Sequence, residues 1–177
     1  MIYNLVKEND PILKEPIQNF DFENPPVDPV QLANDLFEAC RRHRGVALAA
    51  NQVGLPYRVF VIDTREEKPL ALFNCKITDY SEEEEYYEEG CVTYPGLFIK
   101  IKRPINIRAR VTNELNITET HRFSGMTARI IQHEHDHLEG INFLSRASKI
   151  RLTFARRKHK LLLRRMKQKL PTNVLSI

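Results

Sequence analysis

The segment IIQHEHDHLEG, residues 130–140, places three histidines within five positions among acidic and apolar side chains. Residues 126–139 contain neither proline nor glycine, and Gly140 is of the type that commonly ends a helix. We therefore predict a helix over this segment. It is either a charged helix exposed to solvent, with incidental histidines, or a helix that binds a metal ion.

Helical geometry distinguishes the three histidines from one another. Residues four apart lie on the same face of a helix, so His133 and His137 can bind one metal ion, whereas His135 points away from it. Glu134 follows the first of these histidines and completes the pattern His-Glu-x-x-His. In that pattern the glutamate can act as a general base for water at the metal. The segment thus predicts two metal ligands and one catalytic carboxylate.

A catalytic zinc or iron site needs a third protein ligand. Two downstream arrangements occur among His-Glu-x-x-His proteases, and this sequence lacks both. One requires a histidine where the chain has Phe143, and the other requires an acidic residue further along, but none occurs after Glu139. The remaining ligand must therefore precede the helix.

Several upstream carboxylates and four other side chains are candidates for the third ligand. Cys40 and Cys75 lie in apolar segments and are interpreted as core residues. His121 lies at the far end of a predicted hairpin, where a surface role is expected. Cys91 follows Gly90, which frees the backbone, and precedes a turn. A thiolate beside two imidazoles is a plausible donor set for Zn²⁺ or Fe²⁺.

The rest of the chain predicts a mixed domain of helices and strands. Asp28 and Pro29 are typical of a helix start, and apolar residues at helical spacing predict a helix over residues 29–44, ended by Gly45. Apolar or alternating segments predict strands at residues 57–63, 70–77, 105–112 and 117–123, the last two forming a hairpin, while the glutamate-rich residues 82–89 predict a solvated strand face. Strands in the middle and helices at the start and end indicate an α+β fold with central antiparallel strands.

Length and composition limit the class of protein. The 177 residues are enough for one domain with a buried core. No apolar run has membrane length, and the N-terminal MIYNLVKENDP lacks the apolar stretch of a signal peptide. Three cysteines without an export signal argue against a disulfide scaffold. We therefore expect a protein of the reducing cytoplasm.

Charge is distributed unevenly along the chain. Residues 149–169 hold ten of the 27 Lys and Arg residues and no acid, so the remaining chain carries 17 Lys and Arg against 23 Asp and Glu. A basic helix joined to an acidic body is expected. Two apolar faces of this helix are predicted to pack partly on the body: Ile150, Phe154 and Leu161 on one, and Leu162, Met166 and Leu170 on the other.

Three short motifs resemble, in their order, those of peptide deformylases, which remove the formyl group from the N-terminal formyl-methionine of new bacterial-type proteins. They are GVALAANQ (45–52), EGCVT (89–93) and QHEHDHLEG (132–140), the last keeping the four-residue spacing of the two histidines. The resemblance covers about residues 1–147 and implies a peptide-deformylase-like catalytic domain. Residues 148–177 are then a basic C-terminal helix and tail of the same single domain.

The resemblance also implies roles for individual residues. It implies three ligands for one divalent metal ion, namely Cys91, His133 and His137. Fe²⁺ is the implied physiological metal, with Zn²⁺, Ni²⁺ or Co²⁺ able to occupy the same site. Glu134 becomes the general acid and base, and the Gln52 side chain with the backbone N–H of Val92 becomes the pair that stabilises an oxyanion.

A pocket for the methionine side chain of the substrate is expected beside the helix predicted over residues 126–139. Met126 and Ile130 share the face of His133 and suit a wall around a thioether. Arg129 on that face is interpreted as a structural arginine that reaches toward solvent, with binding of a glutamate or of the peptide backbone as alternatives. The predicted substrate-binding set also includes residues of the first two motifs: Val46, Ala47, Glu89 and Gly90. Ala47 replaces a glycine of the family motif and is expected to narrow or reshape the groove.

The expected function is metal-dependent removal of the formyl group from formyl-methionyl nascent polypeptides, with release of formate. The resemblance further implies that residues 149–169 dock on the ribosome surface, and a merely solvated helix is the alternative. Two other functions stay open. One is another His-Glu-x-x-His metallohydrolase or metalloprotease, which would cleave internal peptide bonds, and the other is an inactive nucleic-acid-binding module.

Overall fold

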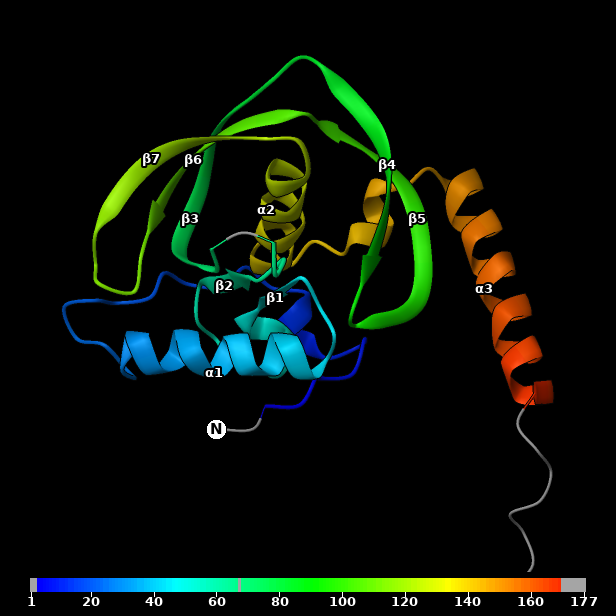
Figure 1. The fold of residues 1–177 in the computed structure, drawn as a ribbon, viewed down its shortest axis with the longest axis horizontal. Helices are drawn as coiled ribbons and strands as arrows, with labels where there is room; N and C mark the ends of the chain where they lie inside the picture. The colour runs from blue at the N-terminus through cyan, green and yellow to red at the C-terminus, as the bar shows by residue number, and fades with distance from the viewer. Residues whose placement is uncertain (1–2, 67, 170–177) are drawn as a thin grey trace, which may run out of the picture.

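The computed structural model describes residues 3–66 and 68–169, with side chains of the last helix described to residue 165. The elements follow one another in the order η1 (Pro11–Leu13), α1 (Pro29–Arg42), β1 (Ala47–Ala49), η2 (Ala50–Val53), β2 (Val59–Ile62), β3 (Leu70–Tyr80), β4 (Glu84–Cys91), β5 (Tyr94–Pro104), β6 (Asn106–Thr112), β7 (Thr118–Ser124), α2 (Gly125–Leu138), η3 (Phe143–Arg146) and α3 (Lys149–Lys169). Helices flank a block of strands, which confirms the predicted α+β fold (Figure 1).

The strands form two antiparallel sheets. The larger sheet has the order β1-β2-β3-β6-β7, and β4 pairs with β5 in a separate two-stranded sheet. The predicted hairpin of β6 and β7 is confirmed, and Asn116 in its turn adopts the left-handed conformation at φ 61°. Within the described residues, the outer edge of β4 pairs with no other strand.

Helix α1 begins as predicted and ends earlier than predicted. The Asp28 side chain accepts a hydrogen bond from the Gln31 amide at 2.6 Å, and Pro29 occupies the first turn. The helix stops at Arg42, and the left-handed residue that comes next is Arg44, at φ 57°, rather than Gly45. Gly45 is needed for a different reason, since a Cβ there would lie 3.0 Å from the Ala47 carbonyl oxygen.

Strand β5 was not predicted, because Pro95 and Gly96 indicate a turn. Beyond them the chain alternates strictly, with Leu97, Ile99 and Ile101 buried and the residues between them exposed. Arg103 continues the buried side of this alternation. A buried arginine at the end of an apolar alternation is the sequence signal that a polar partner lies opposite.

Helix α2 lies between the larger sheet and the β4–β5 hairpin (Figure 1). Ile130, Ile131 and Leu138 pack into the core formed with that sheet. The opposite face of the sheet packs against α1. The helix ends where predicted, and Gly140 adopts φ 67°, where a Cβ would lie 2.6 Å from the backbone of Lys14. Because α2 is covered on most sides, its polar side chains need partners inside the protein.

Helix α3 packs on the hairpin with a different face from the predicted ones. Leu152 and Ala155 lie against the cluster of Leu97, Ile99, Ile101 and Phe143. Ile150 and Phe154 are 70% and 66% exposed, so the prediction that their face packs on the body is wrong. The side chain of Met166, and Leu170, lie outside the described part of the chain. Among the described residues, no helix is both long enough and apolar enough to span a membrane.

Candidate metal centre

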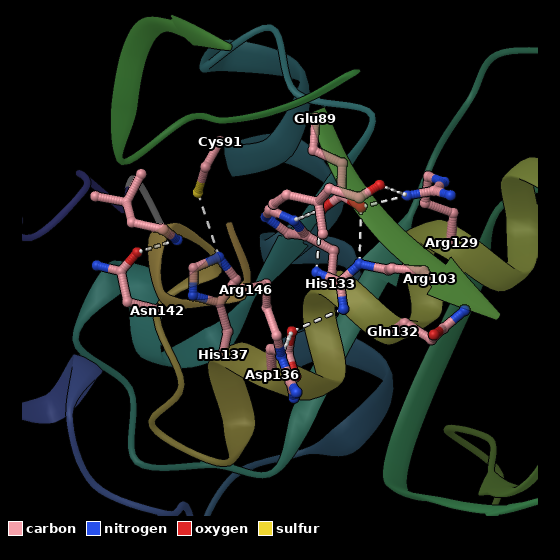
Figure 2. Close-up of polar contacts among 12 residues, drawn as sticks. Glu89, Cys91, Arg103, Arg129, Gln132, His133, Asp136, His137, Asn142 and Arg146 are labelled. Carbon is pink, nitrogen blue, oxygen red and sulfur yellow. Dashed lines mark hydrogen bonds and ion pairs between the residues drawn. The ribbon is translucent and has the colours of Figure 1, made fainter. Parts of the chain in front are cut away.

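Three potential ligands converge between β4 and α2. The donor atoms of Cys91, His133 and His137 all lie within 4.8 Å of one another. The Cys91 sulfur lies 3.3 Å from Nε2 of His137. Figure 2 shows the cysteine facing the two histidines across the gap between strand and helix.

The other upstream candidates lie elsewhere. Cys40 and Cys75 are fully buried in the two cores beside the larger sheet. His121 is exposed on β7 and contacts Glu119 at 3.0 Å. Their predicted structural or surface positions are confirmed, and Cys91 alone of the four lies beside the two histidines.

The end of β4 places Cys91 by means of a local irregularity. The pairing of β4 with β5 shifts register between Gly90 and Cys91, so the cysteine pairs with Tyr94 at the tip of the hairpin. A Cβ at Gly90 would lie 2.6 Å from the ring of Phe98. A side chain at position 90 would therefore force the Phe98 ring to move, where the strand turns toward α2.

His133 is oriented by the Glu89 carboxylate. Its Nδ1 lies 3.1 Å from Oε2 of Glu89, which leaves Nε2 available for a metal ion. Burial alone would lower the pKa of His133, but hydrogen bonding with Cys91 and Glu89 raises that pKa to about 10. A cation that binds this imidazole must therefore displace a proton.

Glu89 is the centre of a buried ionic network (Figure 2). Arg103 donates to its two oxygens at 2.7 and 3.0 Å, and Arg129 donates to Oε1 at 2.7 Å. Burial by itself raises the pKa of Glu89, and the hydrogen bonds from His133 and Arg103 more than offset this, lowering the pKa to about 2. These partners occupy both oxygens of the carboxylate, so the Glu89 side chain is engaged with His133 and the two arginines.

The network continues through Asp136 to the segment after α2. Arg103 donates to Asp136 at 2.8 Å, and Arg146 contacts the same carboxylate with its Nε at 3.1 Å. No sequence pattern identified this part of the network. One signal in the sequence is that Arg103 continues an alternation on β5 whose other buried members, Leu97, Ile99 and Ile101, are apolar.

A residue of η2, within the first motif, binds the main chain of His137 at the end of α2. The Asn51 side chain donates to the His137 carbonyl oxygen at 2.6 Å. Burial, followed by the charges of His133 and Arg103, lowers the pKa of His137 well below its usual value. A neutral imidazole is the form that binds a metal ion.

Glu134 reaches the same space as a buried carboxyl group. It is 5% exposed, and its Oε2 has no hydrogen-bond partner in the described part of the protein. Burial raises its pKa to about 7, against the opposing charges of His133 and Arg103. His135 lies on the other side of the helix, 3.4 Å from Arg58 and 3.5 Å from Glu139, as the helical geometry predicts.

Gln52 points its amide nitrogen toward the candidate metal site. Its Oε1 accepts a hydrogen bond from the Ala49 amide at 2.9 Å, which fixes the orientation of the side chain. Its Nε2 lies 3.3 Å from the Cys91 sulfur and 3.0 Å from the Thr93 hydroxyl. Thr93, which received no role from the sequence, thus holds the amide of Gln52.

A cavity of about 430 Å³ opens beside these groups. Gln52, Cys91, His133 and Glu134 line it. Its walls include every predicted substrate-binding residue: Val46, Ala47, Glu89, Gly90, Met126 and Ile130. Val92 and Arg129 also line it.

Arg129 differs from its predicted role. It is only 4% exposed, so the interpretation as an arginine that reaches toward solvent is wrong. Its guanidinium binds Glu89 and the carbonyl oxygens of Glu85 and Ile101. The alternative that it binds a glutamate is confirmed.

Comparison with known proteins gives the same family throughout. The family model described as polypeptide deformylase matches residues 2–153. The peptide deformylase of Cytophaga hutchinsonii is 42% identical over 158 residues, covering 85% of each chain. That of Aquifex aeolicus is 35% identical over 172 residues, covering 94% of this chain and all of the relative.

Solved structures agree with the sequence comparison. A peptide deformylase from Synechococcus elongatus in complex with actinonin has a TM-score of 0.79 at 30% identity, covering 89% of this chain and 86% of that one. The peptide deformylase from Thermus thermophilus has a TM-score of 0.81 at 29% identity, covering 95% of this chain and 99% of that one. The chain therefore belongs to the peptide deformylase family, whose members are metal-dependent hydrolases that deformylate nascent polypeptides.

Proposed function

We propose that Cys91, His133 and His137 hold one divalent metal ion and that Glu134 moves the protons of the deformylation. The observation that carries this proposal is the convergence of the three donors within 4.8 Å beside a buried carboxylate oxygen without a protein partner among the described residues. A buried polar atom is normally hydrogen-bonded, so the open acceptor of Glu134 is suited to a water molecule in the site.

The donor set fits the metal ions that the family resemblance suggests. One thiolate and two imidazoles suit Fe²⁺, Zn²⁺, Ni²⁺ and Co²⁺, and we propose Fe²⁺ as the physiological ion. When bound, the metal would lower the pKa of a water molecule and polarise the formyl carbonyl group.

The side chains then divide the chemistry between them. Glu134, with a pKa raised to about 7 by burial, is suited both to accept a proton from the attacking water and to give one to the leaving amine. The oxygen of water bonds to the formyl carbon, the C–N bond breaks, and formate and a free amine result. Nε2 of Gln52 and the backbone N–H of Val92 are the proposed donors to the oxyanion, and one such donor is commonly worth ~2.7–4 kcal/mol.

The cavity is proposed to hold the methionine side chain of the substrate. Met126 and Ile130 supply an apolar wall from α2, and Val46, Ala47 and Gly90 line the cavity from the first two motifs. The contribution of Glu89 and Gly90 to substrate binding is proposed to come from their main chain, at the edge of β4 that no described strand pairs with. An extended peptide can pair with such an edge.

One experiment tests this function directly. Protein purified anaerobically with iron is expected to release formate from formyl-Met-Ala, and metal analysis of the same sample should give one ion per chain. An internal-peptide substrate without a formyl group should stay intact. Cleavage of that substrate without formate release would favour the metalloprotease alternative instead.

We propose in addition that α3 docks on the ribosome, which would place the enzyme in the cytoplasm near new chains. Arg156, Arg157 and Lys158 are exposed, as are the apolar side chains of Ile150 and Phe154. Binding to phosphates weakens steeply as salt rises. Co-sedimentation with ribosomes should therefore be salt-sensitive and should be lost when Arg156, Arg157, Arg164 and Arg165 are all changed to Gln. Equal sedimentation of both proteins at low salt would contradict this role.

A further inference from the structure

Arg129 makes buried contacts with two strands that do not belong to its own helix. Its Nη1 donates to Oε1 of Glu89 at 2.7 Å and to the Ile101 carbonyl oxygen at 3.2 Å, and its Nη2 donates to the Glu85 carbonyl oxygen at 2.9 Å. Its guanidinium lies 5.6 Å from the centre of the Tyr87 ring. All of these partners lie on β4 or β5, whereas Arg129 lies on α2. Figure 2 shows its contact with Glu89.

These contacts matter because the candidate metal site is divided between the same two elements. His133 and His137 lie on α2, and Cys91 ends β4. Among the described residues, the hairpin pairs with no strand of the larger sheet, so no β ladder fixes its distance from α2. Besides the chain connection from β5 into β6, side chains that span the space between hairpin and helix therefore contribute to setting that distance.

Arg129 and Arg103 have different parts in spanning this gap. Arg103 on β5 binds Glu89 on its own hairpin and Asp136 on α2, so it joins carboxylates. Arg129 instead binds the main chain of both strands, in addition to the Glu89 carboxylate that holds His133. Main-chain carbonyl oxygens have no rotamers of their own, so these contacts tie the planar guanidinium to the backbone of both strands.

We propose that Arg129 is a positioning residue for the metal centre. It holds the hairpin at the distance from α2 that brings Cys91 to the two histidines, and it fixes the Glu89 carboxylate that orients His133. This inference rests on the metal site proposed above, because a positioning role requires those three side chains to be the ligands.

The test compares metal binding by full-length variants. Arg129→Met removes the donors but keeps an apolar stem, and Arg129→Lys keeps one charge but has a single nitrogen. Arg122→Met, on the exposed strand β7, is the matched control for loss of a positive charge. Dissociation constants for Zn²⁺ are measured by competition with a chelator, and the Co²⁺ absorption spectrum reports the bond to the cysteine sulfur.

Losing a direct partner of a metal ligand usually weakens binding about 10- to 100-fold. Because Arg129 acts through Glu89 and the hairpin, we expect Arg129→Met to weaken Zn²⁺ binding about 10-fold, the lower end of that range. Arg129→Lys should bind with intermediate affinity, and Arg122→Met should bind like the parent. The cobalt band assigned to the thiolate should weaken in Arg129→Met, which a simple loss of global stability would not cause in protein that is still folded. Arg129 acts partly through Glu89. In the double variant of Arg129→Met and Glu89→Gln, the loss of Zn²⁺ binding free energy should therefore be smaller than the sum of the losses in the two single variants.

The outcomes separate this inference from the proposed metal site. If the parent protein binds no Zn²⁺ at one equivalent, the metal site itself is wrong. If the parent binds and Arg129→Met stays within twofold of it with an unchanged cobalt spectrum, or if its effect adds fully to that of Glu89→Gln, the positioning role is overturned. Should Arg129→Met fail to fold, Arg129→Lys decides, since parental affinity in that variant contradicts the proposal.

Discussion

The sulfur of Cys91 lies 3.3 Å from Nε2 of His137, although the two residues are 46 positions apart in the chain. This proximity supports the proposal that Cys91 is the third ligand. In Cys91→Ser we expect most of the metal and most of the formate release to be lost, measured on the same preparation. Cys40→Ser and Cys75→Ser are the controls and should keep both, since those thiols lie in the cores. A Cys91→Ser protein with one tight equivalent of metal and full turnover would refute the assignment.

The carboxyl group of Glu134 should be needed for rate and not for metal binding. Glu134→Gln removes the proton acceptor but preserves the shape of the side chain, so the metal should stay while the turnover number falls by a factor on the order of 10²–10⁴. His135→Ala should remain largely active, because His135 contacts Arg58 and Glu139 on the other side of α2. Loss of metal from His135→Ala would show that the assignment of helix faces is wrong.

Only one of the three thiols should react in the folded protein. Burial raises the pKa values of Cys40 and Cys75 to about 12, so neither forms the reactive thiolate near neutral pH. Cys91 is partly exposed in the cavity. Iodoacetamide followed by peptide mass spectrometry should therefore label Cys91 alone in chelator-treated protein, and bound Zn²⁺ should protect it. Labelling of Cys75 at the same rate would contradict the structure.

Acid should destabilise the fold through Glu89. Its pKa is about 2 in the folded protein and near 4.5 in an unfolded chain, so the carboxylate stabilises the fold above pH 4.5, and this stabilisation is lost as the pH falls toward 2. The difference corresponds to about 3 kcal/mol. Urea unfolding of chelator-treated protein at several pH values should show this loss, and Glu89→Gln should flatten it. Glu88→Gln, at the exposed neighbour, should behave like the parent.

Ala47 should affect substrate binding more than chemistry. It is buried, lines the cavity and has no positive φ, so the methyl group that replaces the family's glycine causes no backbone strain. Ala47→Gly should change KM, or the preference among side chains in the first position, while metal content stays constant. Formate release from formyl-Met and formyl-norleucine peptides measures this. If Ala47→Gly lost metal to the same extent as it lost activity, Ala47 would have to act on the metal ligands, which contradicts this prediction.

The sequence predicted the helices and most strands because their signals are local. Helical spacing alone distinguished His133 from His135, and the Asp28-Pro29 pair marked the start of α1. Strand β5 was missed because Pro95 and Gly96 precede an alternation that begins only at Leu97. Local patterns also cannot show that the tip of the β4–β5 hairpin brings Cys91 beside α2.

The ionic network could not be predicted for a related reason. Glu89 and Arg103 lie on the two strands of the hairpin and Arg129 and Asp136 on α2, and no local pattern pairs the strand residues with the helix residues. These side chains are buried only because α2 packs between the larger sheet and the hairpin, and the sequence alone does not show that packing. Helical geometry placed Arg129 on the face of His133, but its partners include main-chain carbonyl oxygens, which no side-chain pattern reports.

The open edge of β4 has a consequence for the range of proteins that this enzyme can process. Main-chain hydrogen bonds along a strand edge are the same for every residue except proline. In the binding mode proposed above, an extended chain held there would be recognised by its direction and by its first side chain in the cavity, and hardly at all by its later residues. A catalyst arranged in this way can serve a whole proteome with one site, because selectivity is confined to the single residue that all of its clients share.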